Sequence, residues 1–409
     1  MNKFFKKLHL WVSVPFGIVI TIICFTGALL VFESDIVALY NKDVLRVKPA
    51  GEPLPLTTLI ARVEQGLADG AEVTGVVVPS TPSEAYKVNI SKPSRAAVYV
   101  DQYTGEVKGQ AERLPFFSEV RRLHRWLMDA RPKDGGIFWG KMIVGASTLA
   151  FVAIMLTGLV IWWPRSRKML KNRLKIVFGK SMNRFWYDLH VAGGFYAMLL
   201  LLAMAMTGLT WSYKWYSEGL YSMFSTETSQ SNVSKVPVEE GAVSSIARPD
   251  AVSSATPQTD AVSAATPQAD AVSGATVLDD GASSKYWGWQ KAFETLNAEY
   301  AGYKTITVGD GTATVALGGF GNQRANDKYG FDTNTGALTS ATLYADASAR
   351  SKASGWVSSL HFGSWGGMVT KVLYFLAALL GATLPLTGYY FWIKRLYGKR
   401  KWLRSCLDF

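Results

Sequence analysis

The chain has 409 residues, 49% of which are apolar, and a formal net charge of +12 at pH 7. This charge does not indicate a nucleic-acid partner, because the basic residues gather beside long apolar stretches instead of covering a soluble surface. Its only two cysteines, Cys24 and Cys406, lie in an apolar stretch and in a basic tail, so they cannot pair with each other.

Four apolar stretches are almost free of charge and long enough, at about 20 residues or more, to cross a bilayer core. We predict a transmembrane helix in each of them: residues 10–32, 138–163, 191–213 and 368–393. The first is too long for the apolar region of a signal peptide and lacks a cleavage pattern, so we expect it to remain as an anchor.

Basic residues cluster beside these stretches in a consistent pattern. They lie before the first stretch, between the second and third, and after the fourth. The positive-inside rule then places both termini in the cytoplasm and the soluble parts on the opposite side of the membrane. The clusters are Lys3, Lys6 and Lys7; Arg165, Arg167, Lys168, Lys171, Arg173, Lys175 and Lys180; and Lys394, Arg395, Lys399, Arg400, Lys401 and Arg404.

Residues 33–120 have the patterning of a small soluble α+β unit. Residues 116–130 then predict a short interfacial helix that carries His124, and Pro132 with Gly135-Gly136 breaks the chain before the second membrane helix. The elements predicted in the unit are a helix over 56–67 and strands over 72–79, 85–91, 96–101 and 106–109.

Residues 216–284 contain a ten-residue repeat, DAVSSATPQT, DAVSAATPQA and DAVSGAT, that has no aromatic residue. Because this composition cannot bury a core, we predict a disordered linker. A solenoid is disfavoured, because the repeat is too short and too polar.

The region after the linker predicts a second soluble α+β unit. A helix is expected over 289–299 and strands over 303–308 and 312–317. The segment YGFDTNTGAL, residues 329–338, parallels YVDQYTGEV, residues 99–107, in the first unit.

Other spacings also repeat between the two halves of the chain. Met1 to His9 resembles Met182 to His190, and Thr-Gly follows each histidine at the same distance, as Thr26-Gly27 and Thr207-Gly208. Lys141 and Lys371 precede Thr157-Gly158 and Thr387-Gly388 by equal spacings. We therefore predict an internal duplication of helix, soluble domain and helix, related by a pseudo-two-fold axis along the membrane normal.

The chain has only four histidines, and each lies just before or at the head of a membrane segment. The predicted topology places His9 and His190 near the cytoplasmic surface, and His124 and His361 near the opposite one. A single histidine at such a place can equally be an amphipathic ring at the membrane interface, but histidines in membrane segments usually face the bundle interior or a polar cavity. Four such positions together predict two facing pairs.

Two imidazoles alone are a poor zinc site, since structural zinc takes four protein ligands and catalytic zinc three. Haem iron needs only two axial ligands once the macrocycle supplies four nitrogens. The paired histidines therefore suit haem b.

Two further groups of residues are candidates for cofactor binding. Gly27 and Gly208 lie 18 residues beyond His9 and His190, which is five turns or about 27 Å along the same helix face. They would leave space there for a second cofactor, although small residues also favour ordinary helix packing. Charged side chains can hold propionates or anchor the helices at the interface: Arg121, Arg122 and Arg125 near the outer pair, and Lys6, Lys7 and Arg184 near the inner pair.

These motifs resemble the PepSY-associated transmembrane helix family. The resemblance rests on Leu-His at the segment heads, Thr-Gly followed by aromatic residues at the segment ends, and the Val-Asp-x-x-Thr-Gly-x-Val hairpin. It covers nearly the whole chain except the repeat linker. The chain departs from the pattern in that linker and in seven extra residues between His124 and Lys141, compared with the stretch from His361 to Lys371.

The functional relatives that the resemblance suggests are bacterial inner-membrane ferric-siderophore reductases. It implies two haems b, with His9 and His190 as axial ligands of the inner haem and His124 and His361 as those of the outer one. Electrons would pass from the cytoplasmic side to the periplasm, where Fe(III) held by a siderophore or another chelate is reduced. Reduction weakens the hold of hard oxygen ligands on iron.

No nucleophile, phosphate loop, nicotinamide fingerprint or flavin fingerprint is recognised in the sequence. An external electron donor is therefore implied, either a quinol or a cytoplasmic reductase. Two alternatives remain: a non-enzymatic, membrane-anchored PepSY binding or regulatory protein, and a transporter, which the apolar helix centres make less favourable.

The complete expectation is a membrane protein with a four-helix transmembrane bundle from an internal duplication and two small α+β PepSY-like extracytoplasmic domains. Its segments are transmembrane helix 1 (1–32), the first periplasmic domain (33–120), a haem-ligand segment with helix 2 (121–163), a basic cytoplasmic loop (164–183), helix 3 (184–215), the linker (216–284), the second domain (285–350), a haem-ligand segment with helix 4 (351–393) and a cytoplasmic tail (394–409).

Overall fold

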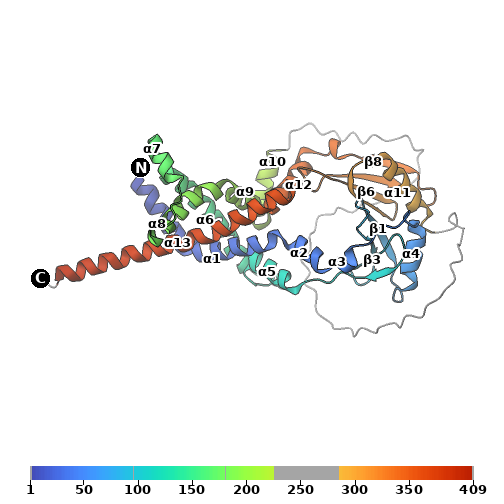
Figure 1. Ribbon diagram of the computed structural model, residues 1–409, viewed down its shortest axis with the longest axis horizontal. Coiled ribbons are helices and arrows are strands. Elements are labelled where there is room, and N and C mark those ends of the chain that lie inside the picture. The colour runs from blue at the N-terminus through green and yellow to red at the C-terminus, as the bar shows by residue number, and fades with distance from the viewer. Residues whose placement is uncertain (1, 95, 180, 225–284, 408–409) are drawn as a thin grey trace.

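The computed structural model describes residues 2–94, 96–179, 181–224 and 285–407. It consists of a helical bundle at one end and a β-sheet with two covering helices at the other (Figure 1). Most of the predicted linker, residues 225–284, lies outside the described residues.

Four helices in the described part of the chain are long and apolar enough to cross a membrane, which confirms the predicted spans. The helices α1, α6, α9 and α13 pack in a ring, so that α1 contacts α6 and α13, while α9 contacts the same two from the opposite side. A shared apolar core joins them through residues such as Ile20, Phe151, Leu201 and Ala377. The bounds are α1 Asn2–Val31, α6 Trp139–Trp162, α9 Gly194–Ser212 and α13 Gly367–Leu407.

The third span is not a single regular helix. It begins as α8 (Met182–Asp188), passes through a π-helical turn (Leu189–Gly193) and continues as α9. Such turns occur mostly as single wide turns inside α-helices, frequently at functional sites. This one, which contains His190, was not predicted from the sequence.

Both termini and the short helix α7 (Arg167–Arg173) lie at the end of the bundle away from the sheet (Figure 1). The basic loop predicted over 164–183 therefore lies on the same side as the N-terminus and the start of the tail. This arrangement agrees with an even number of crossings.

One predicted boundary was wrong. The linker was expected to start at residue 216, but α10 (Lys214–Ser222) is helical and contacts α9 and α12. Lys214 pairs with Glu218 one turn later at 3.6 Å, an interaction that favours a helix. The tail predicted from residue 394, for which no secondary structure was predicted, continues α13 to Leu407, because its lysine, arginine and leucine residues favour a helix and no proline interrupts it.

Two short helices that were not predicted follow the first span, α2 (Glu33–Tyr40) and α3 (Lys42–Leu45). The buried Asn41 between them donates to the carbonyls of Val37 and Glu112 and accepts from the Glu112 amide. This side chain joins the end of the span to the chain that leaves the first soluble unit.

The soluble elements follow the predicted order. The predicted helix 56–67 is α4 and the predicted helix 289–299 is α11. The bounds in the first unit are α4 Leu56–Gln65, β1 Val73–Pro79, β2 Tyr86–Ile90, β3 Ala96–Val100 and β4 Val107–Gly109. Those in the second are α11 Trp287–Glu299, β5 Tyr303–Gly309, β6 Thr312–Leu317, β7 Asn326–Phe331 and β8 Leu338–Thr342, followed by a 3₁₀ turn, Tyr344–Asp346.

The parallel sequences at 99–107 and 329–338 form the same turn in both units. Asp101 accepts hydrogen bonds from the amides of Tyr103 and Thr104, and Asp332 accepts them from the amides two and three residues after it. Gly105 and Gly336 follow with φ of 71° and 74°, a conformation that side chains disfavour. The spacing that the two segments share is therefore explained by the turn that it builds.

The two units share one antiparallel eight-stranded sheet of order β4-β3-β2-β1-β5-β6-β7-β8. The junction is the antiparallel pairing of β1 with β5, from Gly75 opposite Gly309 to Pro79 opposite Thr305. Residues of α4 and α11 belong to a single apolar core with the strands of both units. The two units are therefore one structural body, which the sequence analysis described as separate domains.

Two helices connect this body to the bundle and carry the remaining histidines. They are α5 (Pro115–Trp126), which contains His124, and α12 (Ala349–Phe362), which contains His361. α5 contacts α1 and α6, and α12 contacts α9 and α10.

Candidate functional site

The four histidines meet in two pairs, one at each end of the bundle. His9 on α1 and His190 in the π-helical turn have ring centroids 6.5 Å apart, with ring planes at 85°. His124 on α5 and His361 on α12 have centroids 6.4 Å apart, with planes at 62°. The pairing expected from the topology is the one that the structure shows.

Each histidine is held through its Nδ1 atom by a threonine of a neighbouring helix. The Nδ1–Oγ1 distances are 3.0 Å for His9 with Thr157, 3.1 Å for His124 with Thr26, 2.8 Å for His190 with Thr387 and 3.1 Å for His361 with Thr207. In three of the four, Nδ1 also lies 3.0 Å from the carbonyl oxygen three residues before the threonine, namely of Ile154, Ile23 or Met204.

These contacts assign the proton on each ring. Every one of the four threonine hydroxyls donates to a carbonyl of its own helix, at 2.6–2.9 Å, so its oxygen accepts from the histidine. A carbonyl oxygen can only accept. The Nδ1 atom therefore carries the hydrogen, and Nε2 keeps its lone pair, which is the arrangement of a metal-binding imidazole with an oriented second nitrogen.

The glycine after each threonine leaves room for the ring. A Cβ atom would lie 3.1 Å from the Cε1 atom of His124 at Gly27, and 3.1 Å from that of His361 at Gly208. At Gly158 it would lie 3.3 Å from Cε1 of His9, and at Gly388 it would lie 3.8 Å from Cε1 of His190. The glycines thus form the wall behind each imidazole.

This geometry changes the role expected for Gly27 and Gly208. Both lie at the outer pair, as their spacing from His9 and His190 predicts, but each contacts a histidine directly. Thr157-Gly158 and Thr387-Gly388 serve the inner pair in the same way and were missed as site residues. The repeated Thr-Gly dipeptide was the signal that could have identified them.

Burial keeps the outer pair neutral. It lowers the pKa of His124 to about 4, and the positive charge of Arg125 adds to this effect. It also lowers the pKa of His361 to about 4, with a further contribution from His124. Both rings therefore have a free nitrogen lone pair at neutral pH.

The arginines near the outer pair lie where expected, but some already have partners. Arg121 forms an ion pair with Glu33, and Arg122 bonds to Glu119 and to the carbonyl of Met128. The guanidinium of Arg125 lies 4.8 Å from the ring centroid of Trp126, and its partial desolvation, together with the positive charge of Arg121, lowers its pKa. Arg125 is thus better placed than Arg121 or Arg122 to receive an anionic group.

At the inner end, Arg184 is taken up by a carboxylate. Its Nε atom lies 2.8 Å from Oδ2 of Asp188, a side chain only 3% exposed. The same oxygen accepts from the amide of Val177 at 3.1 Å. Asp188 thereby fastens the basic loop to the helix end just before His190.

Trp211 is a site neighbour that the sequence analysis did not single out. Its ring centroid lies 4.9 Å from that of His361, edge to face, and it also stacks against Phe362. The side chain is 40% exposed. It lies between the outer pair and the surface.

Within the described residues, no group of three or more His, Cys, Asp or Glu side chains is arranged to hold a metal ion. A family model described as the PepSY-associated TM region matches residues 6–395. The chain belongs to this family.

The matched range of this PepSY-associated family contains all four histidines and the four Thr-Gly dipeptides that contact them. The resemblance drawn from the motifs is thus confirmed, and with it a membrane protein. No curated protein matches the chain.

Proposed function

We propose that this protein is a transmembrane dihaem b electron carrier that reduces Fe(III) in siderophore or other chelate complexes. The observation that carries the proposal is the repeated unit of histidine, threonine and glycine, which occurs four times and builds two facing imidazole pairs.

The spacing of the rings fits one metal ion between two imidazoles. Transition-metal bonds to imidazole nitrogen measure about 2.0–2.1 Å, and with about 1.2 Å from nitrogen to ring centroid they place the two centroids about 6.3–6.6 Å apart. The observed values are 6.5 and 6.4 Å. Both pairs therefore have a separation at which His9 with His190, and His124 with His361, could hold one ion between them.

The donor set favours haem over a bare ion. Each pair offers two imidazole nitrogens and, among the described residues, no cluster that would complete a zinc site. When bound, haem would supply four more nitrogens and one-electron chemistry at the iron. The histidines would hold it, the Nδ1 bonds to threonine and carbonyl would orient them, and Arg125 would be a partner for a propionate.

The two pairs lie at the depths that transfer across a bilayer requires. His9 and Thr26, which bonds the outer His124, are 17 residues apart on α1, or about 26 Å along the helix axis. One pair therefore lies near each end of the bundle. We propose that the end with both termini is cytoplasmic, in a bacterial inner membrane, and that the sheet is periplasmic.

The substrate class comes from the resemblance to ferric-siderophore reductases. Reduction of Fe(III) to Fe(II) weakens the bonds to hard oxygen ligands, so that electron delivery releases the metal. Trp211 and the outer histidines lie on the side where such a chelate would arrive. The donor on the other side is a quinol or a cytoplasmic reductase.

The test is a dithionite-reduced minus oxidised spectrum of the purified full-length protein, with haem quantified per chain. We expect two low-spin haems b, one remaining in His124→Ala and one in His9→Ala. Reoxidation by a ferric chelate should follow in the wild type and be lost in His124→Ala.

A protein without haem after haem-replete expression would contradict the proposal and favour the membrane-anchored binding module. Soluble-domain ligand binding that continues in the His9→Ala and His124→Ala variants would support that alternative. Two haems without reoxidation by any ferric chelate would retain the electron carrier and reject the substrate.

A further inference from the structure

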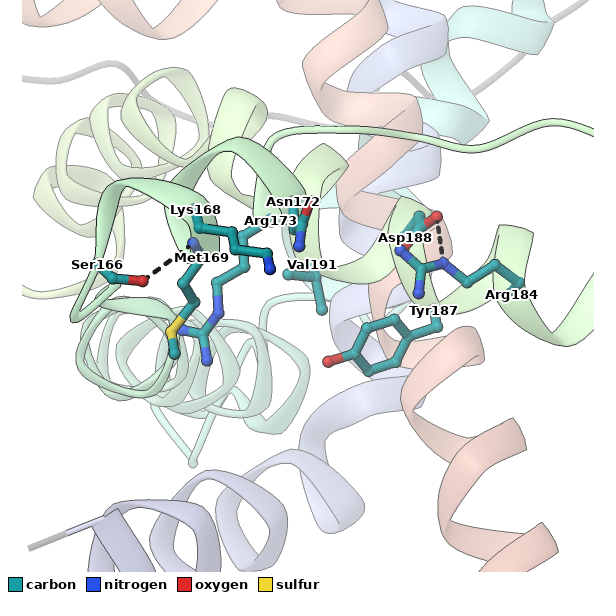
Figure 2. Close-up of a pocket in the computed structure, with 9 residues that line it drawn as sticks. All are labelled: Ser166, Lys168, Met169, Asn172, Arg173, Arg184, Tyr187, Asp188 and Val191. Atoms are coloured by element: carbon teal, nitrogen blue, oxygen red, sulfur yellow. Dashed lines mark hydrogen bonds and ion pairs between the residues drawn. The ribbon is translucent and has the colours of Figure 1, made fainter.

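A cavity of about 390 Å³ lies between the basic loop and the start of the third span. α7 contributes one wall, with Lys168, Met169 and Arg173, and α8 contributes the other, with Tyr187 and Asp188 (Figure 2). Its volume is in the range of small-molecule sites. The proposed function assigns it no role.

The cavity is connected to the inner histidine pair through the chain itself. Val191 lines it and directly follows His190, in the same π-helical turn. Asp188 also lines it and ends α8 just before that turn. A molecule bound here would lie beside the residues that carry one of the two inner imidazoles.

The cavity contains three basic residues, but two of them are already engaged. Arg173 donates through Nη1 to the carbonyl of Ile161 at 3.1 Å and to that of Trp162, at the end of α6. Arg184 is paired with Asp188. Among the described residues, Lys168 makes no ion pair or hydrogen bond. The guanidinium of Arg173 is turned toward backbone carbonyls, and the carboxylate of Asp188 shares the wall with Lys168, so the cavity is poorly matched to a phosphate.

The remaining groups suit a neutral ring that carries hydroxyls. Oδ1 of Asp188 has no hydrogen-bond partner among the described residues, whereas Oδ2 has two. The Tyr187 hydroxyl and the Asn172 amide also make no hydrogen bond there. Met169, Val191 and the ring of Tyr187 provide apolar surface between these polar groups.

The surroundings place the cavity at a lipid boundary. On the same loop, Phe178 is 75% exposed and Met182 is 64% exposed, and Trp163 at the end of α6 is 68% exposed. Exposed aromatic residues at the ends of spanning helices mark the interface between membrane and water. A carrier that is dissolved in the bilayer would present its polar head at this depth.

We propose that this cavity binds the hydroquinone head of a membrane quinol and that the quinol would be the electron donor for a haem held by the inner histidine pair. The inference rests on the proposed function. In the step, both O–H bonds of one hydroquinone break, giving a quinone, two protons that pass to water and two electrons. Two Fe(III) chelate ions on the opposite side are the oxidant and become Fe(II).

Binding is tested first, by isothermal titration calorimetry with duroquinol as the probe, on full-length protein in zwitterionic lipid nanodiscs that is kept reduced with dithionite. Met169→Trp and Asn172→Trp fill the cavity from α7 and should each weaken binding at least about ten-fold, or about 1.4 kcal/mol. Lys171→Trp is the matched control, because Lys171 lies on the same helix, is exposed and does not line the cavity.

Electron transfer is tested second, by following haem absorbance after duroquinol is added. We expect reduction in the wild type and in Lys171→Trp, with rates at least about ten-fold lower in both filling variants. Dithionite, which needs no site, should reduce all four proteins to the same extent.

Three results would overturn the proposal: no saturable binding of duroquinol, equal binding in the filled variants, or displacement of duroquinol by inorganic phosphate, which would indicate an anion site. If the protein holds no haem but the filled variants still lose duroquinol binding, the proposed function and the donor role both fail, whereas the quinol site stands. If haem is present but duroquinol reduces it equally in every variant, only the assignment of this cavity fails.

Discussion

The glycine behind each imidazole leads to a graded prediction for four glycine-to-alanine substitutions. A Cβ added at Gly27 or Gly208 would meet the histidine Cε1 at 3.1 Å, at Gly158 at 3.3 Å and at Gly388 at 3.8 Å. The last distance is an ordinary contact, whereas the first two require the ring to move by a few tenths of an ångström. Such movement would strain the Nδ1 bonds to threonine and carbonyl.

The magnitude follows from two opposing terms. Alanine gains about 0.8–1.0 kcal/mol over glycine in a helix interior, and this gain is common to all four positions. Overpacking costs about 1–3 kcal/mol where the Cβ is too close. The difference between Gly27→Ala and Gly388→Ala should therefore be about 1–3 kcal/mol, which is about 5- to 150-fold in cofactor affinity.

The assay measures haem per chain after equal dilution of each purified variant, together with the midpoint of thermal unfolding of the haem-free protein. We expect Gly27→Ala and Gly208→Ala to lose haem at the outer pair, Gly158→Ala to lose less at the inner pair, and Gly388→Ala to behave as the wild type. If Gly388→Ala lost as much haem as Gly27→Ala, contact with the histidine ring would not be what requires glycine at these positions.

Three further predictions concern other parts of the molecule. Thr26→Val removes the hydroxyl that accepts a hydrogen bond from His124, and the loss of this orienting partner should weaken cofactor binding at the outer pair about 10- to 100-fold. Thr26→Ser keeps the hydroxyl and should retain the affinity. Titration with haem measures the affinity of both variants. In the haem-free protein, the pKa values of His124 and His361 are lowered, so between pH 6.5, the ordinary histidine pKa, and about pH 4 the unfolded chain binds more protons than the folded one. The free energy of unfolding, measured by chemical denaturation, should therefore fall as the pH drops from 6.5 toward 4. This fall should be smaller in His124→Ala. Ile306→Ala, at a fully buried position on β5 beside the β1 junction, should cost about 2–5 kcal/mol and destabilise both soluble units together; separate unfolding of the two units in hydrogen exchange would contradict a single shared sheet.

Several features were predictable from the sequence because they depend on local pattern. The four spans follow from length and apolar composition, which decide membrane insertion without reference to neighbours. The turns at Asp101 and Asp332 follow from the Asp, Thr and Gly residues that build them. The pairing of four histidines across the bundle followed from their positions at the span heads and from the direction of each span.

Other features were decided only when the chain folded. The sequence places Thr157-Gly158 within its own helix, and only packing shows that His9 lies against it, because contacts between helices depend on rotation and depth. The pairing of β1 with β5 joins two units that each look complete in the sequence. It could not be predicted, because the sequence of an edge strand does not indicate which strand it will pair with. The pairing of Arg184 with Asp188, which neutralises one of the three cations that line the cavity, likewise depends on distances between side chains. Composition and periodicity thus determined where the histidines lie along the membrane, and tertiary packing determined which groups hold them.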